Sequence, residues 1–171
     1  MNRLLILIFV LAFSFVNAQS KVGTINTDII LSQMPELKGV EAEMQDYGKK
    51  LDTDLRKKYQ DYQKLVEKFE AEQEELNEVI QKFRINEITD LEEDIQKFQQ
   101  NSQQLIRAKQ DELLRPLYSK IGKALEAIVE EEKFTQIFNE GNNLIYISPE
   151  YDVTEKVMKV LGLPTDILKQ E

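Results

Sequence analysis

The chain has 171 residues, of which 31 are acidic and 22 basic, and it contains neither cysteine nor histidine. These absences exclude disulfide cross-links, a histidine pH switch, and the thiolate and imidazole ligands of common metal sites. They also remove the usual nucleophile and base of hydrolytic enzymes, and the acidic balance speaks against a nucleic acid partner. We therefore expect a protein that is not an enzyme and has no catalytic, cofactor-binding or metal-binding residues.

Residues 1–18 predict a secretory signal peptide. Arg3 precedes an apolar run over residues 4–16, and the small residue Ala18 comes directly before Gln19, where we expect cleavage. A membrane anchor is the alternative, but the run is shorter than the roughly 20 residues that cross a bilayer. Removing the signal peptide takes away one base and no acid, so we expect an exported, soluble chain with a net charge of −10.

Residues 19–35 predict the first part of a small body. Residues 22–26 are rich in β-branched side chains and predict a strand. A short helix is expected over residues 28–34, because Asn26, Thr27 and Asp28 form a helix-start signal in front of it.

Residues 36–129 predict a long helical insert that is rich in Glu, Lys, Gln and Leu. Apolar side chains recur at steps of three and four residues, which is the pattern of a coiled-coil seam. The first stripe consists of Leu37, Val40, Met44, Tyr47, Leu51, Leu55, Tyr59, Tyr62, Val66, Phe69, Leu76, Ile80 and Phe83. The second stripe begins with Ile88, Leu91, Ile95, Phe98, Ser102 and Leu105.

Two apolar stripes that follow one another along the chain predict an antiparallel hairpin, since each stripe needs an apolar partner. We expect its tip within residues 81–89, because the segments on either side are nearly equal in length. Thr89 and Glu92 have the spacing of a capping box, and Asn86 is a second candidate cap. The alternative is one straight helix of about 95 residues, because no glycine or proline forces a turn here.

Aromatic side chains replace much of the leucine that a tight dimeric zipper prefers. One interpretation is that they pack the two arms of the hairpin together. The other is that some face outward and contact an apolar partner. The candidates for such contact are Tyr47, Tyr59, Tyr62, Phe69, Phe83 and Phe98.

Residues 70–94 carry ten acidic side chains against two basic ones, a net charge of −8. Such a tip is expected to repel anionic membrane surfaces, so contact with a membrane is doubtful. Glu70, Glu74 and Glu78 have the spacing of one helix face, but a solvated acidic face explains them better than a calcium site.

Pro116 interrupts the second helical segment. An interior proline removes the hydrogen bond to the carbonyl group four residues earlier, that of Glu112, and costs about 3 kcal/mol in an unbroken helix. This cost is tolerable where a helix bends anyway. We therefore interpret Pro116 as the elbow between arm and body.

Residues 130–171 predict the second part of the body. We expect strands at 134–138 and 144–147, joined as a hairpin by the sequence NEGNN, and a capped helix at 152–161 that Gly162 ends. With residues 19–35 this makes a body of marginal size with exposed sheet edges. Cyclic oligomerisation would cover those edges.

The order of these segments resembles the Skp/OmpH family of periplasmic chaperones. The specific segments are KVGTINTDIILSQMPELKG at the start, the proline-containing ELLRPLYSKIGKALEAIVEEEKFTQIF, and DVTEKVMKVLG near the end. The resemblance implies a mainly α fold with a small β-rich oligomerisation body and a long antiparallel hairpin arm, assembled as a jellyfish-like homotrimer. It also implies an ATP-independent holdase that holds unfolded outer-membrane proteins in the periplasm. The acidic tip departs from the basic arms of well-known relatives, so no lipopolysaccharide site is inferred.

A structural coiled-coil scaffold of the cell envelope is the alternative function. It would be favoured if the aromatic side chains were all buried between the two arms and no unfolded client bound. Unlike a holdase, a scaffold would leave an unfolded client to aggregate.

Overall fold

The computed structural model describes residues 20–140 and 145–169. The predicted signal peptide and its cleavage site lie outside the described residues. The chain divides into two compact units, which we call the body unit (Met1–Met34 with Leu117–Glu171) and the arm unit (Pro35–Pro116). Each unit is considered by itself below.

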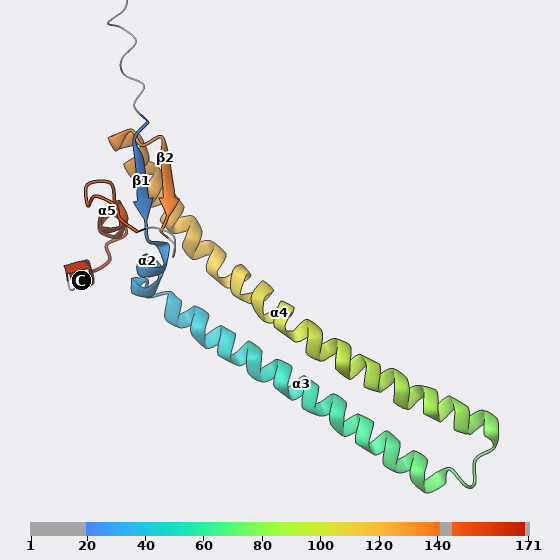
Figure 1. The fold of residues 1–171 in the computed structure, drawn as a ribbon. Coiled ribbons are helices and arrows are strands. Elements are labelled where there is room, and N and C mark those ends of the chain that lie inside the picture. Colours follow the sequence, from blue (N-terminus) through green and yellow to red (C-terminus); the bar gives the residue numbers. More distant parts are fainter. Residues whose placement is uncertain (1–19, 141–144, 170–171) are drawn as a thin grey trace, which may run out of the picture. The chain divides into compact units, whose positions relative to one another are not determined.

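The body unit contains a two-stranded parallel sheet (Figure 1). Strand β1 (Val22–Ile25) pairs with strand β2 (Gln136–Asn139), with Val22 opposite Gln136. The predicted strand at 22–26 is confirmed. The predicted hairpin of 134–138 with 144–147 is wrong, because β2 pairs with β1, and residues 145–147 form no strand. Residues 141–144 lie outside the described residues.

Polar side chains fix the register of this non-local pairing. Thr24 Oγ1 donates a hydrogen bond to Glu140 Oε1 over 2.9 Å, and Thr27 Oγ1 donates one to Asn139 Oδ1, also over 2.9 Å. On the other side of β1, an isolated parallel bridge joins Thr24 to Asp152. Strand β1 therefore has neighbours on both sides, whereas within the described residues β2 pairs with β1 alone.

Two short helices of the body unit match their predictions. Helix α2 (Thr27–Gln33) begins where Asn26 Oδ1 accepts a hydrogen bond from the backbone N–H of Ile29 over 3.0 Å. Helix α5 (Thr154–Val160) ends near Gly162, whose φ of 70° is easy for glycine and strained for other residues. A 3₁₀ helix, η2 (Asp166–Lys169), follows.

The core of the body unit combines buried side chains from four of its elements. It includes residues of β1, α2, α5 and the second half of the long helix α4 (Glu78–Glu132). The buried apolar residues are Ile25, Ile30, Leu31, Met34, Leu117, Ile121, Ala124, Ile128, Phe134, Val153, Val157 and Met158. The helix face that buries residues 117, 121, 124 and 128 follows the period of an α-helix, so α4 contributes one continuous apolar stripe.

The arm unit is the antiparallel helical hairpin that the two stripes predict, and the straight-helix alternative is wrong. Helix α3 (Leu37–Glu72) runs out to a turn, and α4 returns (Figure 1). The turn occupies residues 73–77, so the prediction of a tip at 81–89 is also wrong. Asn77 Oδ1 accepts a hydrogen bond from the backbone N–H of Ile80 over 3.0 Å and caps α4. Thr89 instead donates to the carbonyl oxygen of Ile85 within the helix.

Pro116 lies inside α4, which runs on through it. The boundary between the two units falls between Pro116 and Leu117, so residues 117–129, assigned to the arm from the sequence, belong to the body unit. Their apolar stripe explains the difference, because it is buried in the body core. The role of Pro116 as an elbow stays a prediction. Within the described ranges, no helix combines the length and the apolar character needed to cross a membrane.

Candidate functional site

The seam between α3 and α4 is only partly buried. Leu51 and Ile95 are the buried apolar residues of the described arm unit. Most other predicted seam residues are half-buried, as a two-helix hairpin allows. They are Leu37, Val40, Met44, Tyr47, Leu55, Tyr62, Val66, Phe69, Leu76, Ile88, Leu91, Phe98 and Ser102. The arm unit by itself therefore leaves a long apolar and aromatic stripe partly open to contact.

Tyr59 and Phe98 lie where the two helices of the arm are joined by polar contacts. Gln99 Nε2 donates a hydrogen bond to the hydroxyl oxygen of Tyr59 over 2.9 Å, although the Tyr59 side chain remains 42% exposed. Lys58 Nζ lies 5.5 Å from the centre of the Phe98 ring and forms an ion pair with Asp94. The ammonium group over the ring is a cation–π contact. These two aromatic side chains thus help to hold α3 against α4.

Phe83 has a different environment from the other candidate contact residues. The sequence placed Ile80 and Phe83 in the stripe of the first helix, which is wrong, because the turn at 73–77 puts both residues at the start of α4. Phe83 is 58% exposed, and Val79 beside it is 78% exposed. Tyr47, Tyr62 and Phe69 keep their places in the half-buried stripe of α3.

Most of the polar residues that hold the arm in register could not be predicted from the sequence. Gln99 and the ion pair of Lys58 with Asp94 had no signal, because a charged or amide side chain on a helix is usually solvated. Asn77 did have one, since asparagine directly before a segment of helix-forming residues is a common N-cap. Val79 could have been noticed as an apolar residue outside the seam spacing.

The acidic side chains of the arm do not gather into a metal site. Glu70 lies in α3, Glu74 in the turn and Glu78 at the start of α4, so the helix face assumed from their spacing does not exist. No cluster that could hold a metal ion occurs in residues 20–140 or 145–169. Exposed pairs such as Lys97 with Glu93, 3.2 Å apart, are surface ion pairs of small energetic effect.

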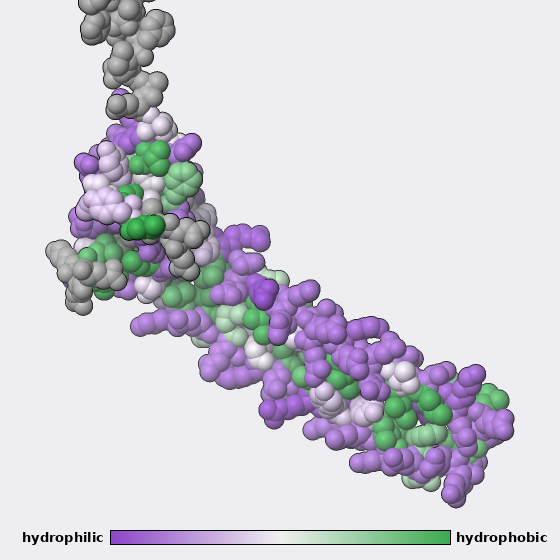
Figure 2. Space-filling view, viewed as in Figure 1, coloured by the Kyte–Doolittle hydropathy of each residue, from purple (hydrophilic) through white to green (hydrophobic). Residues whose placement is uncertain are grey.

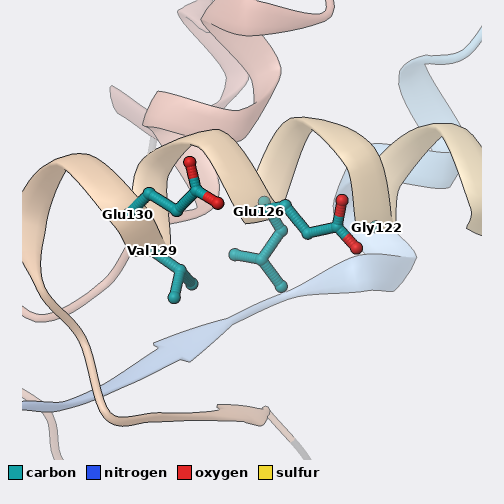
Figure 3. A pocket seen from close by; sticks show the side chains of 5 residues that line it. Gly122, Glu126, Val129 and Glu130 are labelled. Carbon is teal, nitrogen blue, oxygen red and sulfur yellow. The ribbon is translucent and has the colours of Figure 1, made fainter.

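The body unit carries a shallow apolar pocket on α4 (Figure 3). Gly122, Leu125 and Val129 line it, Glu126 and Glu130 stand along it, and its volume is about 380 Å³. A Cβ atom added to Gly122 would meet nothing within 4 Å, so the depression remains open there. With residues at positions i, i+3 and i+7, this apolar face suits packing against another element.

A network of charges ties the start of β1 to the end of α4 and to α5. Glu132 forms ion pairs with Lys156 and with Lys21, the latter over 2.9 Å, and Lys21 Nζ also lies 3.9 Å from the centre of the Phe134 ring. Hydrogen bonds from Lys156 and then from Lys21 hold the pKa of Glu132 below its usual value of 4.5. The network is structural, since each member has a partner from another part of the body unit.

Comparison with known proteins places the chain in a family. The model of the family described as outer membrane protein (OmpH-like) matches residues 21–161. An uncharacterised protein of Aquifex aeolicus (strain VF5) is 31% identical over 121 residues, which is 66% of this chain and 74% of that protein. The crystal structure of an OmpH-like protein from Caulobacter crescentus CB15, a candidate outer membrane chaperone, aligns with a TM-score of 0.61. That alignment has 13% identity and covers 84% of this chain and 85% of the other, so it shows a shared fold.

The family match spans both units described above, from the start of β1 through the hairpin to the end of α5. The small sheet, the two long helices and the pairing of β1 with β2 are thus features of one matched region. The family model matches most of the sequence and the fold agrees with it, so the chain belongs to the OmpH-like family.

Proposed function

We propose that the protein is an ATP-independent holdase chaperone of the periplasm, which binds unfolded outer-membrane β-barrel proteins and prevents their aggregation before membrane insertion. The observation that carries this proposal is the half-buried aromatic stripe of the arm unit. Family membership supports it, as does the description of the Caulobacter crescentus structure as a candidate outer membrane chaperone.

The chemistry of the client explains why such a stripe is useful. A β-barrel protein has strands with alternating apolar side chains, and in water these strands pair edge to edge. Tyr47, Tyr62, Phe69 and Phe98 keep part of each ring accessible, and Tyr59 and Phe83 are exposed. Burial of apolar surface is a non-directional interaction, so scattered aromatic side chains can shelter many sequences without imposing a fold. We propose Tyr47, Tyr59, Tyr62, Phe69 and Phe98 as client contacts. Phe83, the sixth candidate from the sequence, lies apart from the stripe at the start of α4 and is considered separately below.

The proposed assembly is a homotrimer formed by the body units. Within the described residues strand β2 pairs with β1 alone, and Phe138 on it is 59% exposed. The apolar face at Gly122, Leu125 and Val129 is a second surface that a partner protomer could cover. A two-stranded sheet is marginal in water, so added strands or helix faces from neighbouring protomers would stabilise it.

Sedimentation velocity tests the proposal directly. The mature chain is measured alone and after mixing with a urea-unfolded outer-membrane β-barrel protein. We expect an elongated oligomer that takes the client into a discrete soluble complex. If the client aggregates and sediments as it does without the chain, the holdase function is wrong.

A structural scaffold of the cell envelope is the second candidate function. The contacts of Tyr59 with Gln99 and of Phe98 with Lys58 favour it, because they show aromatic side chains that join the two helices. Replacing Tyr59, Tyr62 and Phe69 by serine separates the two functions. If the protein is a holdase, the wild type captures the client and the variant, measured where it is still helical, does not. If the protein is a scaffold, neither captures the client, and the change only lowers the melting temperature.

A further inference from the structure

The turn at the end of the arm is fixed by side-chain hydrogen bonds. Asn77 caps α4 through the backbone N–H of Ile80, over 3.0 Å. Gln81 Nε2 donates to the carbonyl oxygens of Gln73, over 2.6 Å, and of Leu76, over 3.1 Å. Because Gln81 donates to the carbonyl group of the α3 C-cap residue, Gln73, and to that of Leu76 in the turn, the turn has a defined geometry. The first turns of α4 therefore start from a fixed orientation.

In the first two turns of α4 three apolar side chains are exposed, which we call the tip patch: Val79, Ile80 and Phe83. Their exposed fractions are 78%, 40% and 58%. Val79 and Phe83 are four residues apart, so they are neighbours on one face of α4. On the opposite face, Ile88 is half-buried and Ile95 is buried. Figure 2 shows apolar surface framed by hydrophilic surface at this end of the arm.

Packing within the hairpin does not account for the tip patch. Ile95 is 4% exposed and is buried by packing in the arm unit, whereas Val79 and Phe83 are among the most exposed large apolar side chains of the described residues. Exposed apolar surface framed by charged residues is typical of a protein interaction site.

The charge around the tip patch defines the chemistry of its partner. Residues 70–94 have a net charge of −8, and of their two basic residues Arg84 already pairs with Glu87 over 2.7 Å. Acidic clients, anionic lipid and the tip of a second copy would all meet a like charge. A segment with basic side chains around an apolar centre complements both the negative charge around the tip patch and its apolar side chains.

We propose that the tip patch and its acidic surroundings form a docking surface for a basic amphipathic segment of another protein. This surface is distinct from the aromatic stripe of the arm and does not depend on the holdase function. Val79 and Phe83 would contact the apolar side of the segment, and Glu74, Glu75 and Asp90 would attract its lysine or arginine side chains.

Fluorescence anisotropy with a labelled synthetic peptide tests this proposal on the full mature chain. The probe is an amphipathic helix of leucine and lysine of about 18 residues, and a scrambled peptide of the same composition is its control. We expect the double variant Val79→Ser/Phe83→Ser to bind the amphipathic probe at least about tenfold more weakly. Leu105→Ser, a matched change at a 40% exposed residue of the same helix, should leave binding unchanged.

Two further measurements test whether the acidic residues attract the probe and where on the chain the probe binds. Glu74→Gln/Glu75→Gln should weaken binding and reduce its dependence on salt. A photoreactive group in the probe should cross-link wild-type protein within residues 74–90, a result that does not depend on how any variant folds. Equal binding of the scrambled peptide, unchanged binding by the serine double variant, or cross-links outside the tip would overturn the proposal.

The holdase assay distinguishes this surface from the client-binding stripe. Val79→Ser/Phe83→Ser should still keep an unfolded β-barrel protein soluble. If the double variant lost client capture together with peptide binding, the tip patch would belong to the client surface and the proposal of a separate docking surface would be wrong. Binding to anionic phospholipid vesicles that depends on Val79 and Phe83 would overturn it as well.

Discussion

Gln99 and Tyr59 join the two helices of the arm by a hydrogen bond of 2.9 Å between an amide nitrogen and a phenol oxygen. Tyr59→Phe removes this bond and keeps the ring. Because the site is exposed, we expect a loss of about 0.5–1 kcal/mol in the free energy of unfolding, measured by urea denaturation. Client capture should be unchanged, since the ring remains.

Tyr118→Phe is the matched control for Tyr59→Phe. Tyr118 is 44% exposed, and its hydroxyl group has no hydrogen-bond partner in residues 20–140 or 145–169. Equal losses for the two variants would show that the bond of Gln99 to Tyr59 contributes nothing.

Gly23→Ala and Gly48→Ala should change stability in opposite directions. A Cβ atom at residue 23 would lie 2.6 Å from Phe134 Cε1 and 2.7 Å from the carbonyl oxygen of Tyr151, so we expect a loss of about 1–3 kcal/mol. At residue 48, inside α3, nothing lies within 4 Å, and alanine should stabilise the helix by about 0.5–1 kcal/mol. Thermal unfolding followed by circular dichroism measures both, and a stable Gly23→Ala variant would contradict the packing of Phe134 against β1.

Glu132 should make stability depend on pH in the acid range. Its carboxylate has a lowered pKa in the folded chain because Lys156 and Lys21 donate hydrogen bonds to it. A carboxyl group with a depressed folded pKa contributes stability above its unfolded pKa, near 4.5, and this contribution disappears as the pH falls through the folded pKa. Glu132→Gln should therefore be less stable than the wild type at neutral pH, and the difference should shrink in acid.

Urea midpoints between about pH 7 and pH 3 test the role of Glu132. Glu131→Gln is the control, because Glu131 is an exposed neighbour that forms no ion pair within residues 20–140 or 145–169. A difference between the Glu132→Gln variant and the wild type that stays constant down to the acid end would refute the role given to its two lysine partners.

Pro116→Ala tests the predicted elbow. Alanine restores the hydrogen bond to the Glu112 carbonyl group, so we expect α4 to become more stable by on the order of 1–2 kcal/mol, reduced from the full proline cost by the greater freedom of the unfolded chain. If Pro116 provides a bend that the holdase needs, client capture should fall although the melting temperature rises. Unchanged capture would leave Pro116 without a role as an elbow.

Added salt should not weaken the capture of acidic clients. The tip carries a net charge of −8, so its electrostatic interaction with an acidic client is repulsive, and screening removes repulsion. Soluble complex is measured by sedimentation at low and high salt. A steep loss of complex with salt would mean that attraction between charges drives capture.

Local patterns predicted the helices and β1 but not the pairing of the sheet. The strand at 22–26 and the capped helices at 28–34 and 152–161 carry their signals within a few residues, at Asn26 and Asp152. The partner of β2 is more than a hundred residues away, and its register depends on contacts such as Thr24 with Glu140. The turn-like sequence NEGNN suggested a local hairpin that the chain does not form.

The tip shows why an element can be predicted while its boundary is not. Thr89 and Asn77 are both plausible N-caps, and counting segment lengths favoured the later one. Helix α4 is capped by Asn77, the earlier of the two, because Gln81 satisfies the backbone carbonyl groups of the turn at Gln73 and Leu76. The same shift moved Phe83 out of the seam and exposed it, which no spacing rule could show.

The hairpin also limits how the arm can change in length during evolution. Lys58 meets Asp94 and Tyr59 meets Gln99 because the turn at 73–77 sets the register of α3 against α4. A deletion in one helix alone would misalign every such pair beyond it and rotate the stripe away from its partner. Longer or shorter arms can therefore arise only through matched insertions or deletions in both helices, placed symmetrically about the turn.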